Sequence, residues 1–189
     1  MIRTKILGRN GNLGISPSVL LTNPKYPHNV GASLRAASCF GIKQIWFTGN
    51  RVKLDSKHRL PREERMKGYA DVDLYQHDYP FEQFPTNITP VCIELVEQAE
   101  VLSEFEHPEN PLYVFGPEDG SVDKMIKRHC HRFVAIPSYH CTNLSAAVYI
   151  VLYDRMMKRR RDGLEPIIPV SAMLKEDRGW VENDQFHEL

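Results

Sequence analysis

Residues 113–154 decide the predicted fold of this chain and read YVFGPEDGSVDKMIKRHCHRFVAIPSYHCTNLSAAVYIVLYD. Two short apolar runs, Tyr113–Phe115 and Phe133–Ile136, each end at a turn containing proline, and a helical pattern starts near Asn143. Runs this short, rich in aromatic and β-branched residues, predict buried strands. The turns that follow them are expected side by side at one edge of a sheet, where open α/β sheets bind ligands.

A β-α-β unit is predicted upstream of this stretch. Residues 19–22 form its first strand and residues 42–48 its second. The loop 23–28 contains two prolines and is expected to be non-helical, so that Asn29 caps the helix between the strands. Gly41 is expected to close that helix in a left-handed conformation. Such a unit implies a parallel sheet with a right-handed crossover.

The rest of the chain contains further predicted elements and one region without an assignment. Residues 91–95 form a strand, residues 121–128 a helix, and residues 101–106 a short helix or turn, whereas residues 71–84 fit no element. The last helix, 143–161, is apolar on more than one face. A surface helix needs only one apolar stripe, so a homodimer interface is expected to cover the second.

Length and composition limit the class of protein. The 189 residues, 42% hydrophobic and 25% charged, predict one globular domain with extended ends. No apolar run approaches twenty residues and the N-terminus lacks a signal core, so we expect a cytoplasmic protein without membrane contact. The four cysteines lack paired spacing and are expected to be reduced. The pairs of His and Cys near residues 130 and 141 lack zinc-binding spacing, so no metal is expected.

Charge is unevenly distributed although the net charge is zero. Residues 51–67 hold seven Lys or Arg against three Asp or Glu, and residues 162–189 hold seven acids against two bases. A solvated surface is the simpler explanation for both clusters. We expect an N-terminal arm (1–17), a central domain (18–161) and an acidic C-terminal extension (162–189).

Three motifs, taken together, carry a resemblance to a known family. The first is Asn29-x-Gly31-x-x-x-Arg35, the second Phe115-Gly116-Pro117-Glu118-x-Gly120, and the third Ile136-Pro137 followed by Thr142-Asn143-Leu144-Ser145. In this order and at strand-to-loop junctions, they resemble the motifs of the SpoU (TrmH-like) branch of the SPOUT RNA methyltransferases.

The resemblance implies an α/β fold, with a parallel sheet flanked by helices and a C-terminal part threaded into a trefoil knot. It also implies a homodimer with composite active sites and S-adenosylmethionine as methyl donor. Most members of this branch methylate a ribose 2′-hydroxyl of tRNA or rRNA. A tRNA is our first expectation. The alternatives are an rRNA 2′-O-methyltransferase and a non-catalytic RNA-binding or assembly protein that keeps the fold.

Four residues match the catalytic positions of the family. Arg35 is expected to hold a phosphate and stabilise the developing alkoxide, because an arginine that stays protonated is no base. The alternative is a solvent-facing helix residue. Glu118 is expected to orient Asn29, or Arg35 of a neighbouring subunit, or only to hold the knot loop. Asn143 is expected to cap the last helix and to contact RNA or donor.

The resemblance also implies the binding residues. Those expected to line the donor pocket are Ile93, Gly116, Ile136, Cys141, Thr142 and Leu144. In this chain Cys141 stands where many relatives have serine. Cations of the basic segment are expected to grip RNA phosphates; these are Arg59, Arg62, Arg65 and Lys67.

Overall fold

The computed structural model describes residues 4–6, 13–53 and 71–169. It divides into two compact units that meet between Arg155 and Met156, and each unit is described by itself. The predicted RNA-gripping residues of segment 54–70 and most of the acidic extension lie outside the described residues.

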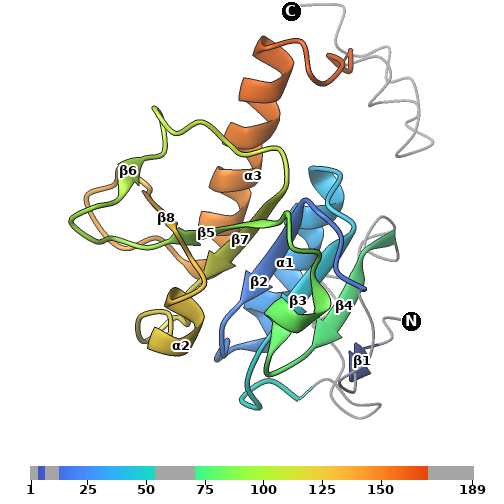
Figure 1. The fold of residues 1–189 in the computed structure, drawn as a ribbon, viewed down its shortest axis with the longest axis vertical. Coiled ribbons are helices and arrows are strands. Elements are labelled where there is room, and N and C mark those ends of the chain that lie inside the picture. The colour runs from blue at the N-terminus through green and yellow to red at the C-terminus, as the bar shows by residue number, and fades with distance from the viewer. Residues whose placement is uncertain (1–3, 7–12, 54–70, 170–189) are drawn as a thin grey trace, which may run out of the picture. The chain divides into compact units, whose positions relative to one another are not determined.

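The described part of the chain contains one eight-stranded sheet in which every pair of neighbouring strands is parallel (Figure 1). The strand order is β1-β4-β3-β2-β7-β5-β8-β6. The strands are β1 (Thr4–Ile6), β2 (Ser18–Leu21), β3 (Gln44–Phe47), β4 (Asp73–Gln76), β5 (Thr89–Ile93), β6 (Glu100–Val101), β7 (Pro111–Phe115) and β8 (Arg132–Ala135). From β2 the chain builds outward to β3 and β4, then crosses to form β5 and β6, and β7 pairs between β2 and β5. A ligand site is therefore expected beyond the carboxyl ends of β2 and β7.

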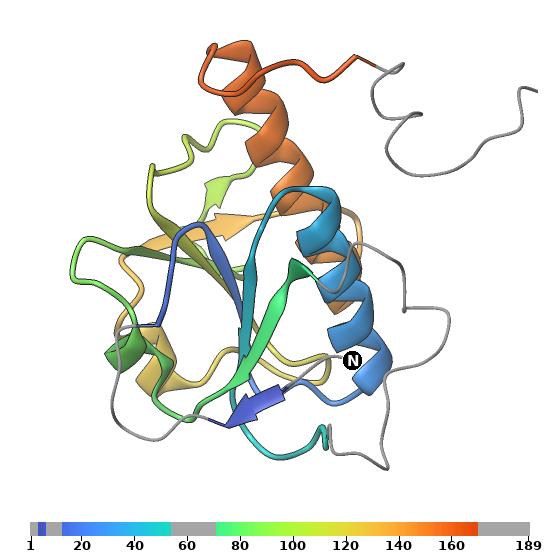
Figure 2. The same ribbon diagram turned by 90° about the vertical axis from the view of Figure 1, so that its right-hand side faces the viewer.

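The helices lie on both faces of this sheet. They are α1 (Pro27–Cys39), the 3-10 helix η3 (Pro80–Gln83), α2 (Lys124–Lys127) and α3 (Leu144–Arg161). Figure 2 shows α1 and α3 on one side of the sheet and α2 on the other. Covering both faces explains why the central strands are apolar throughout instead of alternating.

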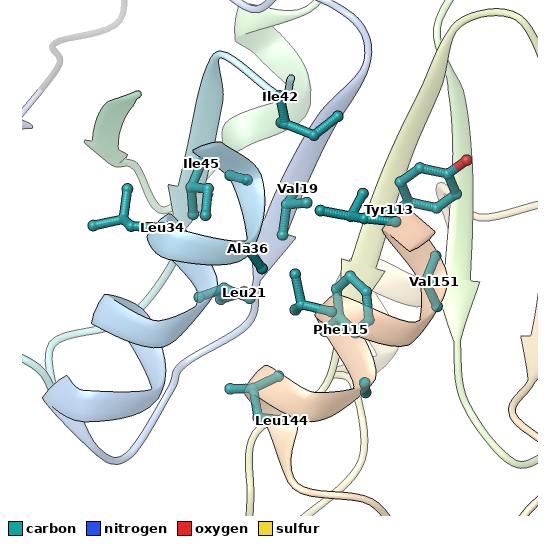
Figure 3. Close-up of a cluster of buried hydrophobic side chains, with 14 of the residues drawn as sticks. Val19, Leu21, Leu34, Ala36, Ile42, Ile45, Tyr113, Phe115, Leu144 and Val151 are labelled. Atoms are coloured by element: carbon teal, nitrogen blue, oxygen red, sulfur yellow. The ribbon is translucent and has the colours of Figure 1, made fainter. Parts of the chain in front are cut away.

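Successive residues of the central strands feed two separate cores. Val19 and Leu21 of β2 face α1 and α3, and Figure 3 shows them with Phe115 of β7 in that cluster. Leu20 faces the opposite core, which includes Trp46 of β3. All five side chains are at most 2% exposed. Neighbouring side chains of each strand thus enter opposite cores, and the observed register of β2 with β3 and β7 sets the positions of the loops that follow them.

The β-α-β unit is confirmed as β2, α1 and β3, paired in parallel. Gly41 follows α1 with φ of 72°, as predicted. The helix start was wrong: α1 begins at Pro27, with Tyr26 as its N-cap residue, because proline fits the first turn, where its missing N–H needs no partner. Asn29 therefore does not cap α1.

Three other predictions need correction. The unassigned region contains β4 and η3. The turn predicted within residues 101–106 is present at residues 102–104, directly after the short strand β6. The helix between β7 and β8 has only four residues, because Asp123 caps it from within the predicted range by accepting a hydrogen bond from the N–H of Met125 (2.7 Å). The turns after β7 and β8 share one edge of the sheet, but β5 lies between the two strands.

Several chemical features complete the description. The four cysteines are free thiols, with Cys92 and Cys130 buried. Within residues 4–6, 13–53 and 71–169, no three His, Cys, Asp or Glu side chains gather as metal ligands would. No helix in those ranges is both long and apolar enough to cross a membrane.

Candidate active site

A cavity of about 730 Å³ opens at the carboxyl edge of the sheet. The ends of β5, β7 and β8 and the first turns of α3 form its walls. All six residues expected to bind the donor line it: Ile93, Gly116, Ile136, Cys141, Thr142 and Leu144. Its volume is in the range of small-molecule sites, and its walls mix apolar side chains with exposed loop backbone. The structure thus brings the predicted donor-binding residues together.

Three residues from the three motifs form a hydrogen-bonded chain at this cavity. The Asn29 side-chain amide donates to Glu118 Oε1 at 2.6 Å, and the Asn143 amide donates to Asn29 Oδ1 at 3.1 Å. Glu118 also lines the cavity, and Asn29 is only 1% exposed. With both ends of its amide occupied, Asn29 has a single orientation. The orienting contact of Glu118 with Asn29 is therefore present, within one chain.

Asn143 caps the last helix, as predicted. Its Oδ1 accepts hydrogen bonds from the backbone N–H groups of Ser145 (2.9 Å) and Ala146 (3.3 Å), which caps α3. The same side chain thus anchors the start of α3 and, through its amide, the side chain of Asn29. The position of α3 and the geometry of the site are coupled through this one residue.

Glu118 is held as a carboxylate by its surroundings. Its oxygens also accept hydrogen bonds from the backbone N–H groups of Lys25 (2.7 Å) and Tyr26 (3.3 Å). Burial alone would raise the pKa of Glu118, but hydrogen bonds from Asn29 and from backbone N–H groups outweigh it and lower the pKa. The loop before α1 is therefore fastened to the turn after β7 by a charged group.

The neighbouring Asp119 ties a third segment to the same turn. Arg51 donates to both of its oxygens, at 2.9 and 2.8 Å, and Lys25 Nζ lies 3.3 Å from Oδ2. The Arg51 hydrogen bond, above all, lowers the pKa of Asp119 to about 2. The loops after β2, β3 and β7 thus meet at two adjacent carboxylates.

Arg35 lies away from this network. It is half-buried on α1, makes no hydrogen bond or ion pair with any described residue, and is not among the residues that line the cavity. The structure of one chain therefore brings Asn29, Glu118 and Asn143 together and leaves Arg35 outside. The spacing agrees with this separation, because six residues along a helix turn the side chain by about 240°, so Asn29 and Arg35 point in different directions from α1.

One residue at the cavity was missed by sequence reasoning. Glu94, directly after β5, lines the cavity, pairs with Lys127 Nζ (2.7 Å) and accepts the N–H of Val122 (3.2 Å). It fastens the segment leading into α2 against the end of β5. Its place after the carboxyl end of a central strand was a usable signal, since this edge binds ligands in parallel sheets.

The cavity suits S-adenosylmethionine by its chemistry. Adenine requires an apolar slot, which Ile93, Ile136 and Leu144 offer, and backbone groups of the surrounding turns can bind its polar edge. Gly116 keeps the turn after β7 close: a Cβ there would lie 3.3 Å from the backbone N of Val122 and 3.4 Å from O of Gly120. A side chain at residue 116 would push this wall outward.

Gly116→Ala is therefore expected to weaken donor binding and to lower the free energy of unfolding by about 1–3 kcal/mol through overpacking. Calorimetric titration with donor and thermal unfolding measure the two effects. Gly120→Ala is the matched comparison: Gly120 also lines the cavity, but its added Cβ meets only Pro117 Cγ at an ordinary 3.7 Å and displaces no wall. Equal donor affinity for the two variants would contradict the role given to Gly116.

Known proteins match this chain in sequence and in fold. The sequence profile of the SpoU rRNA Methylase family matches residues 16–153, which is most of the chain. The chain belongs to this family. The predicted class, an RNA methyltransferase of the SpoU branch, is confirmed by this membership.

Individual relatives agree with the family. The chain is 29% identical over 161 residues to the tRNA (cytidine-2′-O-)-methyltransferase TrmJ of Methanocaldococcus jannaschii, covering 77% of this chain and 69% of TrmJ. Among solved structures, the SpoU methyltransferase AviRb from Streptomyces viridochromogenes in complex with AdoMet has a TM-score of 0.66 at 20% identity, covering 76% of this chain and 60% of AviRb. The chain thus spans less than two thirds of AviRb.

A third relative is closer in length. It is a solved structure from work on the 2-OH methylation of C/U34 on tRNA, with a TM-score of 0.64 and 22% identity. The match covers 77% of this chain and 96% of that one. These structural likenesses establish the parallel α/β fold of the SpoU family for this chain.

Proposed function

We propose that this chain methylates the ribose 2′-hydroxyl of a tRNA, with S-adenosylmethionine as donor. The hydrogen-bonded chain from Glu118 through Asn29 to Asn143, at the mouth of a cavity lined by all six expected donor-binding residues, carries the proposal. The relatives that act on tRNA ribose support the choice of substrate.

The residues at the cavity have separate roles in binding the donor and in positioning the groups at its mouth. The bound donor supplies a methyl group activated by a sulfonium. Backbone and apolar groups at Gly116, Ile136 and Leu144, which line the cavity, would hold the donor. Asn29 is buried, with both ends of its amide occupied by Glu118 and Asn143, so its part is to position these two side chains at the cavity mouth. The 2′-oxygen would accept the donor's methyl group, and its hydroxyl proton would leave to a phosphate or to water.

Arg35 acts in this proposal from the partner subunit. It lies outside the cavity of its own chain and has no partner among the described residues. Its guanidinium would hold the phosphate beside the target ribose and stabilise negative charge on the attacking oxygen. Each composite site would then combine the cavity of one chain with Arg35 of the other.

A homodimer is part of the same proposal. Large apolar side chains remain accessible where α1 ends beside α3: Ile150 is 37% and Tyr153 is 53% exposed, and Phe40 packs edge-on against Tyr149 and Tyr153. We name these four residues the α1–α3 face. A second copy covering this face would remove its aromatic and aliphatic surface from water. The trefoil knot that the resemblance implies, with the C-terminal part of the domain threaded through it, also belongs to this proposal.

Ile150→Asp is expected to convert the dimer into monomers, because a carboxylate in an apolar interface must lose its hydration. Light scattering coupled to size exclusion measures the mass. Met125→Asp on α2 is the matched control: Met125 is 62% exposed on the opposite side of the sheet and should leave the dimer intact. Dimeric Ile150→Asp protein, or a monomeric wild type, would contradict the proposed interface.

Two measurements test the function against its alternatives. Calorimetric titration with S-adenosylmethionine separates an enzyme from a non-catalytic RNA-binding protein, which would bind no donor. Incubation with labelled donor and total RNA, followed by separation of the RNA classes, distinguishes the substrates. Label in tRNA supports the proposal, whereas label confined to rRNA supports the first alternative.

A further inference from the structure

Two aromatic rings stack on one another at the surface beside the donor cavity. Tyr26 and His28 have ring centroids 5.3 Å apart and planes inclined by 22°. Both residues are exposed, Tyr26 to 42%. They lie at the start of α1, just after the loop that leaves β2. Neither ring belongs to the two hydrophobic cores of the described residues, so core packing explains neither their exposure nor their alignment.

The pair is fastened to the active site. The backbone N–H of Tyr26 donates to Glu118 Oε1 at 3.3 Å, and Glu118 lines the donor cavity. Lys25 is fixed twice, by its backbone N–H to Glu118 and by Nζ to Asp119, and its Nζ lies 5.3 Å from the centroid of the Tyr26 ring. The carboxylate that orients Asn29 therefore also sets the place of the rings.

The charges around the pair point to stacking rather than to phosphate binding. Lys25 and Arg51 supply two positive charges, and Glu118 and Asp119 supply two negative charges within the same cluster. Since these balance, the loop offers a polyanion no net attraction. What it does offer is aromatic surface, on which any unpaired nucleobase can stack.

We propose that Tyr26 and His28 form a stacking surface for an unpaired base of the RNA substrate, next to the nucleotide that is methylated. This inference rests on the proposed function for the identity of the substrate. An unpaired base fits the reaction, because a ribose can approach a recessed donor only when its nucleotide is free to leave a helical stack. Stacking of the base on the two rings would fix the position of the single-stranded RNA relative to the cavity.

The test uses a short single-stranded RNA carrying 2-aminopurine, whose fluorescence falls when the base stacks. Wild-type protein is expected to quench the probe. Tyr26→Ala and His28→Ala are expected to quench it less and to bind it about tenfold more weakly. Tyr26→Phe keeps the ring and should bind like wild type. Tyr79→Ala is the matched control, since Tyr79 is 63% exposed but lies at the start of η3, on a different element from the two stacked rings.

Salt separates stacking from charge. Stacking predicts that the ratio of affinities between wild type and Tyr26→Ala stays constant as salt rises, whereas a phosphate contact predicts that it shrinks. Unchanged donor affinity shows that each variant is folded. The inference is overturned if Tyr26→Ala and His28→Ala both bind the probe like wild type, if Tyr26→Phe is as weak as Tyr26→Ala, or if the difference disappears at high salt.

Failure of the proposed function would look different. It would appear as wild-type protein that transfers no label from S-adenosylmethionine to RNA, a result that does not involve Tyr26 or His28. Quenching of the probe that depends on both rings would still support the stacking surface in that case.

Discussion

Arg35→Ala is expected to lower kcat for methyl transfer by about a hundredfold to a thousandfold, the usual loss when one group that stabilises developing charge is removed. Donor affinity should not change, because Arg35 does not line the cavity of its own chain. Single-turnover assays with labelled donor measure the rate, and calorimetry measures the affinity. Arg35→Lys should recover only part of the rate, since an ammonium cannot form the paired contacts of a guanidinium.

Arg128→Ala is the matched control for this loss. Arg128 is an exposed arginine that follows α2, outside the cavity, and its replacement removes the same charge from the protein. Near-full activity of Arg35→Ala would contradict the catalytic role and favour a solvent-facing helix residue. A large loss of donor affinity would instead show that Arg35 shapes the donor pocket.

Mixing two inactive variants tests whether Arg35 acts across the dimer. A heterodimer of Arg35→Ala and Glu118→Gln chains contains one composite site in which both residues are intact. Activity is therefore expected to return on mixing if the arginine comes from the partner, and to stay absent if it acts within its own chain.

Glu118→Gln is expected to reduce both activity and stability. The Glu118 carboxylate accepts hydrogen bonds from N–H groups of Asn29, Lys25 and Tyr26. In glutamine an NH2 group replaces one of the two carboxylate oxygens, so a donor would face these N–H donors. Each hydrogen bond to a charged group contributes about 1.5–3 kcal/mol, so losing one or two should lower the free energy of unfolding by a few kcal/mol at most. Asn29 then loses its fixed orientation, and kcat falls with it.

Chemical denaturation and initial-rate assays measure the two effects. Glu97→Gln is the control: Glu97 is an exposed glutamate in the loop after β5 and does not line the cavity. Wild-type stability and activity of Glu118→Gln would contradict the network described here.

The pH dependence of stability follows from the same group. Because the pKa of Glu118 is lowered on folding, its contribution is complete above the ordinary range for a glutamate. It is lost as the pH falls through the lowered value, when the folded carboxylate becomes protonated. Wild-type stability should therefore fall in acid more steeply than that of Glu118→Gln.

The sequence predicted the parts of the fold that local patterns control. The strands β2, β3, β7 and β8 are short apolar runs, and periodicity finds such runs well. The pattern was wrong at the start of α1, because Pro27 predicts a loop as a helix breaker but also fits the first turn of a helix. It also missed β4, whose residues Asp73 and Gln76 are polar at both ends of a four-residue strand.

The sequence predicted which residues belong to the site, but not which of them hydrogen-bond to one another. The motifs supplied Asn29, Glu118 and Asn143 separately, and their order in one hydrogen-bonded chain depends on the register of β2 against β7, which no local pattern encodes. The fastening of Lys25 and Arg51 to Asp119 was not foreseen for the same reason. Strand order decides which loops become neighbours, and it is a property of the whole fold.

The most direct test of the account is nucleoside analysis of tRNA after reaction with S-adenosylmethionine. Nuclease digestion and mass spectrometry would compare wild-type protein with Arg35→Ala. We predict a single ribose-methylated nucleoside with wild type that is nearly absent with the variant. A methyl group on a base, equal methylation by both proteins, or donor binding without any methylated nucleoside would contradict it.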